Sequence, residues 1–197
     1  MKTAILRFLV LNNLFAIGTM LSGQTNLLQN TNADLGSKNW RVYGQSTVEE
    51  FEDSRVFVLR NGGYFLQDVI LNRLDVGQYA LLIGRGSSER INLDGAITGL
   101  PNLYGYMMDG GNPSGGQIYA YLQDMSTTLA HPSRPNEWVI MWGVFQVPEK
   151  TGAIRFFLNQ AERKGVPHNG SAARFDDLGL YLFDTEREAL DFAKAYK

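Results

Sequence analysis

Two adjacent carboxylates, Asp176 and Asp177, stand at the start of the last apolar strand-like segment. In a regular strand, one face here carries the even positions Asp176, Leu178, Leu180 and Leu182. A carboxylate at the edge of such a buried row needs a partner, and a bound cation would supply one. The alternative is a strand start whose acid lies in water, and the residues alone leave both interpretations open.

Aromatic and polar side chains alternate with apolar ones in three other segments. Sugars present apolar ring faces edged with hydroxyls, so their sites combine exposed aromatic rings with planar polar groups. If the alternate residues form the core, the outward positions carry three pairs: Trp142 with Gln146, Phe157 with Asn159, and Tyr121 with Gln123. We expect the three strands to be neighbours, so that these pairs share one outer face, which either binds a ligand or is covered by another segment.

The glycine-rich segment 87–116 contains Tyr104 and Tyr106, with a short strand expected over 103–108. Long insertions in a rigid sandwich usually lie at one end or across one face. The two tyrosines therefore either line a sugar cleft or plug it, unless the segment is only a solvent loop. The candidate carbohydrate-binding residues are Trp142, Tyr121, Phe157, Asn159, Gln146, Gln123, Tyr104 and Tyr106.

Catalytic signatures are scarce. The chain has no His-Glu-x-x-His, no Gly-x-Ser-x-Gly and no phosphate loop, and its two histidines, His131 and His168, each adjoin a proline. A glycosidase needs two carboxylates at a fixed separation, and no pattern links any two of Glu137, Asp109, Asp124 and Glu162. We therefore expect no enzyme.

Composition suits one globular domain: 197 residues, 44% hydrophobic, with a net charge of -2. Lys and Arg number 18 against 20 Asp and Glu, without runs of like charge, so nucleic acid is not an expected partner. The absence of cysteine excludes disulfides, thiolate metal sites and a thiol nucleophile.

The first residues have the order of a secretory signal. Lys2 and Arg7 precede an apolar run over 8–21, which is too short to span a bilayer, and small residues follow it. The alternative, a buried first helix, lacks a capping pattern. We expect a signal peptide over 1–24, a secreted or periplasmic (cell-envelope) location, and no membrane span in the mature chain.

Turn signals recur at the intervals of an all-β domain, from Asn61-Gly62-Gly63 to Asn169-Gly170. The segments on either side of Asn61-Gly62, 55–60 and 64–71, are expected to pair as a hairpin. No helical patterns alternate with the strands, so the predicted fold over 25–184 is a jelly-roll β-sandwich of two antiparallel sheets. Further strands are expected over 78–83, 117–123, 138–147, 153–159 and 175–183, and a C-terminal helix over 185–197.

The order of short motifs resembles the carbohydrate-binding modules of families four, nine and twenty-two, which are galactose-binding-like β-sandwiches. The motifs are Asn26-Leu27-Leu28-Gln29-Asn30, Trp40, Gly77-x-Tyr79, Trp138 leading to Phe145-Gln146-Val147-Pro148, and Phe175-Asp176-Asp177-Leu178-Gly179-Leu180. The resemblance implies binding of an oligo- or polysaccharide. It also implies that Trp40 and Trp138 are structural, so neither is placed in the site.

Modules of this group commonly hold a structural calcium between the first strand region and the last strand. Where their opening reads Phe-Glu, this chain has Ala33 and Asp34, and Asp34 keeps an oxygen ligand one carbon shorter. The resemblance thus implies a calcium site from Asp34, Asp176 and backbone carbonyls.

The predicted function is non-catalytic carbohydrate binding by an exported module. The alternative is a structural or adhesive envelope protein that uses the same fold for protein contacts. A small glycoside hydrolase is less favoured, because it requires two acids facing each other in an open cleft.

Overall fold

Alternating apolar and polar residues form antiparallel strands throughout the computed structural model, which describes residues 24–72, 75–90, 99–109, 121–128, 130, 133–161 and 170–196. Except for Gln24, the predicted signal peptide lies outside the described residues. The same is true of His131, Glu162 and His168. The elements are β1 Arg41–Phe51, β2 Ser54–Ile70, β3 Tyr79–Ser88, β4 Pro101–Asp109, β5 Tyr121–Ser126, β6 Val139–Gln146, β7 Thr151–Gln160, β8 Ala173–Phe183 and α1 Glu186–Ala195. None of the described helices is long and apolar enough to cross a membrane.

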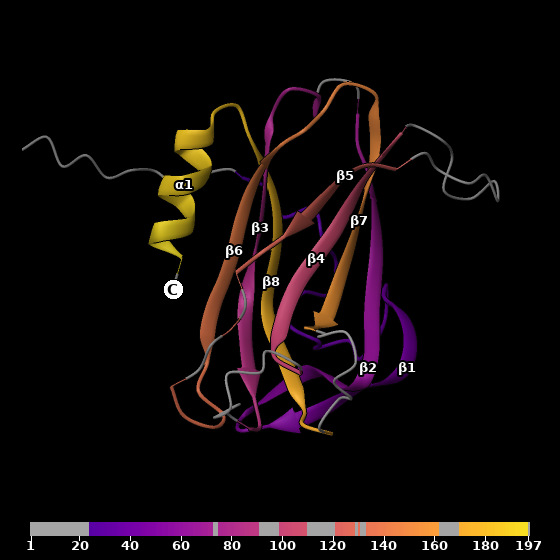
Figure 1. Cartoon of the computed structure of the whole chain (residues 1–197), viewed down its shortest axis with the longest axis vertical. Helices are drawn as coiled ribbons and strands as arrows, with labels where there is room; N and C mark the ends of the chain where they lie inside the picture. Colours follow the sequence, from indigo (N-terminus) through magenta and orange to yellow (C-terminus); the bar gives the residue numbers. More distant parts are fainter. Residues whose placement is uncertain are drawn as a thin grey trace, which may run out of the picture.

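The strands form two layers that share β2. The hydrogen-bonded order is β5-β4-β7-β2-β8-β3-β6, with β1 on the free side of β2. Residues 65–70 of β2 pair with β7, whereas residues 57–59 pair with β8, so this long strand passes from one layer to the other. In Figure 1, β6, β3 and β8 lie on the side next to α1, and β4, β7, β2 and β1 lie on the other. The predicted jelly-roll β-sandwich is confirmed.

The core fills the space between the layers. Every strand except β1 contributes a fully buried apolar side chain, for instance Phe57, Leu82, Leu103, Met125, Met141, Phe156 and Phe175. A Cβ on Gly86 would lie 2.7 Å from Cε of Met141 and 2.8 Å from Cβ of Pro101, so β3 can approach β4 closely only because this residue is glycine.

The N-terminal segment 26–40 closes one open side of the sandwich. Leu27 donates its N–H to the carbonyl of Leu180 at 2.9 Å, and the N–H of Leu178 donates to Thr31 at 3.1 Å, so this segment lies along β8. Trp40 ends the segment with 6% exposure and packs on Phe57, whose ring centroid is 5.2 Å away. This segment therefore belongs to the core structure and fixes the edge of β2.

The hairpin predicted around Asn61-Gly62 is wrong, because β2 continues through it. Asn61 and Gly62 have the positive φ angles of a turn, 50° and 75°, but the chain does not reverse there. Instead the register with β1 shifts between Tyr43 and Gln45, and the extra residues of β2 form a bulge. The residues on both sides of Asn61-Gly62 pair instead with β1, a strand that was not expected from the sequence.

The helix α1 covers the outer face of the layer that contains β3, β6 and β8. Ala189 and Ala193 are buried against Leu81, Ile83 and Phe183. Thr185 caps the helix: its hydroxyl accepts the N–H of Glu188, and the Glu188 carboxylate accepts the N–H of Thr185. The predicted C-terminal helix is thereby confirmed. Among the described elements, no helix covers the outer face of the opposite layer.

Candidate functional site: an aromatic sheet face

Six aromatic rings gather on the outer surface of the layer β1-β2-β7-β4-β5. Each ring contacts at least one other, with centroids 4.6 to 6.3 Å apart. We call this surface the aromatic face; its rings are Tyr43, Tyr64, Phe157, Tyr104, Tyr106 and Tyr121. A contiguous set of rings from five strands gives a broad apolar surface with polar edges, which suits a flat amphipathic ligand.

Strand register explains why the rings meet. Phe157 pairs with Leu66 on one side and Tyr104 on the other, and the neighbouring row contains Arg155 and Tyr106. Phe156 and Leu158, the sequence neighbours of Phe157, point into the core. The alternation of β7 therefore places Phe157 on the outer surface. The aromatic face is thus a direct product of alternation within correctly paired strands.

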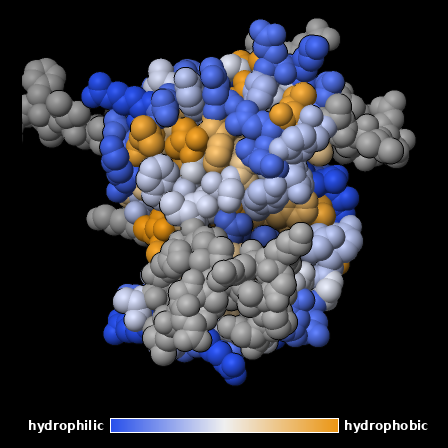
Figure 2. Space-filling view, viewed as in Figure 1, coloured by the Kyte–Doolittle hydropathy of each residue, from blue (hydrophilic) through white to orange (hydrophobic). Residues whose placement is uncertain are grey.

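Two rings of the aromatic face are well exposed to solvent. Tyr121 is 55% exposed and Tyr43 is 40% exposed, while the other four rings are half-buried. Figure 2, drawn in the orientation of Figure 1, shows hydrophobic residues in separate groups bordered by hydrophilic ones. Among the described residues, four of the five exposed large hydrophobic side chains lie on β1, β2 and β5. Exposed apolar surface is therefore concentrated on the layer that carries the aromatic face.

Charged groups on the aromatic face bind one another. Arg155 donates from Nε and Nη2 to the two carboxylate oxygens of Asp68, at 2.7 and 3.0 Å, and Arg41 also pairs with Asp68. The hydroxyl of Tyr104 donates to Asp124 at 2.5 Å. Burial, together with this hydrogen bond, raises the pKa of Tyr104, and hydrogen bonding with Asp124 raises the pKa of Tyr121. Both tyrosines therefore keep their hydroxyl protons at neutral pH.

The structure brings together five of the predicted sugar-binding residues: Tyr104, Tyr106, Tyr121, Phe157 and Asn159. Tyr104 and Tyr106 belong to β4, which lies between β5 and β7. The two tyrosines are consequently part of the sheet surface. They neither form a separate loop that lines a cleft over the sheet nor plug such a cleft. Within the glycine-rich segment 87–116, residues 91–98 and 110–116 lie outside the described residues.

Gln123 does not join Tyr121 on the aromatic face. The register between β4 and β5 shifts, so Tyr121 pairs with Met108 while Gln123 pairs with Met107. Adjacent positions on β4 point to opposite sides, and Met107 is in the core. The β5 residue that follows Tyr121 on the aromatic face is therefore Asp124, because a bulge reverses the alternation expected between Tyr121 and Gln123.

Trp142 and Gln146 also lie elsewhere, so the prediction that they share a face with Phe157 is wrong. Trp142 pairs with Ile83 and packs in the cluster under α1, and Gln146 pairs with Tyr79. The reason is the strand order: β6 is at the far end of the second layer, whereas β7 lies between β4 and β2. Alternation identified outward positions but gave no information on which layer each strand joins.

Four residues of the aromatic face were not among the predicted sugar-binding residues: Tyr43, Tyr64, Asp124 and Arg155, of which Arg155 was expected to face outward beside Phe157. Tyr43 was missed because β1 was not recognised as a strand. Tyr64 stands two residues before Leu66 on the outward side of β2, and its stacking on Tyr43 at 4.6 Å follows from their pairing. The alternation of β2 held the signal for Tyr64, although the hairpin prediction obscured it.

The expected position of Asp176 is wrong: it does not share a face with Leu178. Asp177 has φ of 48°, and the β3–β8 register shifts between Ile83 and Arg85, so a bulge turns Asp176 to the side of Arg85. The Asp176 carboxylate is 3.3 Å from Nη2 of Arg85. An arginine therefore already partners this buried acid.

The other predicted calcium ligand, Asp34, is exposed, and its carboxylate accepts a hydrogen bond from Asn32 at 2.6 Å. The described residues contain no group of three or more His, Cys, Asp or Glu side chains that could hold a metal ion. A calcium ion at Asp176 would have to displace Arg85 or share the carboxylate with it. Calcium binding by Asp34 and Asp176 stays a prediction from the sequence resemblance.

Comparison with known proteins gives matches of fold. No family model and no curated protein matches the chain. The CBM22-2 xylan-binding domain from Paenibacillus barcinonensis Xyn10C has a TM-score of 0.51 and 16% identity, over 78% of this chain and 98% of that domain. The tandem CBM22-1–CBM22-2 domain of the same protein has a TM-score of 0.50 and 15% identity, over 82% of this chain and 50% of that one.

A third structure, the enzymatically active domain of tailspike protein 4 from bacteriophage CBA120, has a TM-score of 0.50 and 16% identity. The match covers 80% of this chain but only 21% of the tailspike domain. At these identities the likeness is one of fold. The chain thus has the β-sandwich fold of carbohydrate-binding modules, and the resemblance read from the sequence is confirmed at that level.

Proposed function

We propose that this protein binds an oligo- or polysaccharide on the aromatic face and does not transform it. The observation that supports the proposal is the contiguous set of six rings, edged by Asp124, Arg155 and Asn159. Pyranose rings stack their apolar faces on aromatic side chains, while hydroxyls bond to planar polar groups at the margin. A structural neighbour described as xylan-binding has the same fold, which adds support.

The dimensions of the aromatic face favour a chain of several sugar units. The rings come from five adjacent strands, and strands are about 4.8 Å apart, so the rings span roughly 19 Å across the sheet. A single sugar would contact only one or two of the six rings. A longer oligosaccharide crossing the strands would bury most of them.

The carboxylates of the aromatic face argue for binding without hydrolysis. Asp68 and Asp124 fall in one row of paired residues, with Arg155 and Tyr106 between them. Three strand spacings separate their backbones by roughly 14 Å. Glycosidases place their two carboxyl groups about 5–9.5 Å apart across an open cleft, whereas here the Asp68 carboxylate is bound by Arg155 and the Asp124 carboxylate accepts a hydrogen bond from Tyr104, which supports binding alone.

Ring removal tests the proposal. Tyr106→Ala and Phe157→Ala should each weaken binding about 10- to 100-fold, since burying one aromatic side chain contributes about 1.5–3 kcal/mol. Tyr79→Ala is the matched control, because Tyr79 is a half-buried tyrosine on the opposite layer, under α1. Binding is measured on a glycan array and by affinity electrophoresis, with circular dichroism to confirm folding.

Undiminished glycan retention by both folded variants would contradict the proposal. If the wild-type protein retained no glycan at all, the adhesive alternative would gain, and the aromatic face would be tested as a protein contact. Export is part of the proposal and rests on the sequence of residues 1–24 alone. It is tested by determining the N-terminal sequence of the protein recovered outside the cytoplasm.

A further inference from the structure

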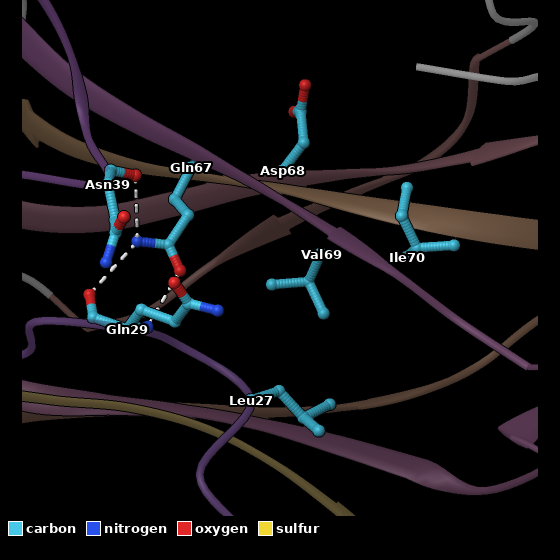
Figure 3. Close-up of a pocket in the computed structure, with 7 residues that line it drawn as sticks. All are labelled: Leu27, Gln29, Asn39, Gln67, Asp68, Val69 and Ile70. Carbon is cyan, nitrogen blue, oxygen red and sulfur yellow. Dashed lines mark hydrogen bonds between the residues drawn. The ribbon is translucent and has the colours of Figure 1, made fainter. Parts of the chain in front are cut away.

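A pocket lies beside the aromatic face, between the N-terminal segment and the end of β2. Its volume is about 430 Å³, which falls in the range of small-molecule sites. Figure 3 shows the residues that line it: Leu27, Gln29, Asn39, Gln67, Asp68, Val69 and Ile70. The lining combines aliphatic side chains with three amides, a mixture suited to a ligand that is apolar on its faces and polar on its edges.

Gln67 holds one wall of the pocket in place. Its side chain is 8% exposed, and its Oε1 accepts the N–H of Gln29 at 2.8 Å. Its Nε2 donates to the carbonyls of Gln29 at 3.1 Å and Asn39 at 3.2 Å (Figure 3). The backbone of the wall is therefore fixed by a buried amide. The side-chain amides of Gln29 and Asn39 make no hydrogen bond within the described chain and remain available to a ligand.

The opposite wall is a strand edge with free backbone groups. Leu71 donates its N–H to Gly152 across the β2–β7 ladder, so Gln67 and Val69 also direct their backbone groups toward β7. The N–H and C=O groups of Asp68 and Ile70 then point to the other side. The last β1 residue paired there is Arg41 with Leu66, so within the described chain no strand takes up these groups. They face the pocket instead.

The pocket and the aromatic face meet at Asp68. In Figure 3 its carboxylate points away from the other lining side chains, and it binds Arg155 on the aromatic face. The row Asp68, Arg155, Tyr106 and Asp124 therefore leads from the pocket across the sheet. A linear ligand lying along this row of residues would have one end at the pocket.

We propose that the pocket binds one uncharged sugar unit at the end of a glycan that lies on the aromatic face. The inference rests on the proposed function and adds a subsite to it. Sugar hydroxyls both donate and accept, which matches the free amides and the edge backbone groups. An added peptide strand fits less well, because within the described part of β2 only Asp68 and Ile70 present free edge groups, and segment 27–29 closes the other side.

Filling the pocket tests the inference. Gln29→Trp should fill it and Gln29→Ala should remove one free amide, while the backbone bonds of Gln29 to Gln67 remain. The control is Leu35→Trp, which adds the same ring at a 60% exposed site that does not line the pocket. Binding is measured by calorimetry with neutral β-1,4-linked xylan, glucan and galactan oligosaccharides of increasing length.

The expected result is a length-dependent loss. Gln29→Trp should lower the affinity for the longer oligosaccharides about tenfold, whereas its affinity for the shortest oligosaccharide that binds should be unchanged. Leu35→Trp should bind every length like the wild type, so the two variants should agree only for the shortest oligosaccharide. In NMR spectra of the wild type, the side-chain amide signals of Gln29 and Asn39 should shift only with the longer oligosaccharides.

Two outcomes overturn the inference, and they are distinguishable. If Gln29→Trp binds every length like the wild type while Tyr106→Ala loses binding, the aromatic face binds glycan and the pocket does not contribute. If the wild type binds no member of a broad glycan array, the proposed function fails and the subsite fails with it.

Discussion

Near the start of β8 the residue Asp176 is only 5% exposed. Burial raises its pKa, and the guanidinium of Arg85 acts in the opposite direction. Arg85 also pairs with Asp177 at 2.8 Å and lies over the ring of Trp138 at 5.4 Å. A buried acid without a partner would be strongly destabilising, so Arg85 fulfils the role for which the sequence suggested a cation.

Chelation tests the calcium prediction at these residues. If calcium binds at Asp34 and Asp176, EDTA should lower the melting temperature, because removal of a ligand that binds only the folded state destabilises it. Asp176→Asn should abolish that difference, and Glu149→Gln, on an exposed loop, should not. Melting curves with calcium chloride and with EDTA provide the measurement. Identical wild-type curves would contradict calcium binding and leave Arg85 as the partner of Asp176.

At the scale of elements, β1 and β2 are joined by a bidentate ion pair between Glu49 and Arg60. The hydrogen bonds from Arg60 lower the pKa of Glu49 from 4.5 to about 2. A carboxyl whose pKa is depressed by folding stabilises the protein above its unfolded pKa and loses this contribution as the pH falls toward the folded value. The pair therefore stabilises the β1–β2 ladder at neutral pH and weakens between pH 4.5 and 2.

Glu49→Gln should lower the melting temperature by about 1–4 °C at pH 7, because half-exposed ion pairs contribute up to about 1 kcal/mol. The difference between variant and wild type should shrink as the pH falls from 4.5 to 2. Thermal melts across this pH range measure it, with Glu149→Gln as an exposed acidic control. A constant difference at all pH values would show that the ionised carboxylate is not responsible.

The capping box of α1 gives a second prediction for an element. Thr185→Ala should cost about 0.5–2 kcal/mol of helix stability, since it removes the hydroxyl that accepts the N–H of Glu188. Amide hydrogen exchange in α1 should become faster. Thr185→Ser retains the hydroxyl and should exchange nearly like the wild type. Equal protection in Thr185→Ala and wild type would mean that packing of Phe192 on Tyr181 and Phe183 alone holds the helix.

Much of the element structure could be predicted from the sequence, because turn signals and runs of β-branched and aromatic residues mark every described strand except β1, although β2 was divided in two, and helical spacing marks α1. The bulges could not. One extra residue at Asp177, or between Tyr121 and Gln123, reverses which side chains point inward, and it depends on the register with a partner strand. This is why Asp176 and Gln123 were placed on the wrong faces while Phe157, in a regular strand, was placed correctly.

For the whole molecule, the two outer faces of the sandwich have different environments. One is covered by α1, which packs over Leu81 and Ile83, and the other carries the exposed rings of Tyr43 and Tyr121. Trp142 looked like a sugar-binding residue because its position is outward and aromatic, but its layer is the covered one. Layer membership depends on long-range pairing, which no local pattern in a single sequence encodes.

Both layers share one core, so the molecule should unfold as a unit, and Trp40 provides the test. Its ring lies 5.2 Å from Phe57, 6.5 Å from Phe65 and 6.0 Å from Phe156, and its Nε1 donates to the carbonyl of Asn30 at 3.1 Å. Trp40→Ala should destabilise the protein by about 3–5 kcal/mol, and lower the melting temperature by roughly 6–20 °C.

Trp40→Phe should cost less than Trp40→Ala, because it retains an aromatic ring beside Phe57 and loses mainly the hydrogen bond to Asn30. Thermal melts followed by far- and near-ultraviolet circular dichroism should give coincident single transitions in both variants. Trp40 contacts Phe57, in the part of β2 that pairs with β8, and Phe156 of β7, so loss of its side chain should weaken the two layers together. Two separate transitions, or a melting temperature in Trp40→Ala within about 2 °C of the wild type, would show that the N-terminal segment is not part of the cooperative core.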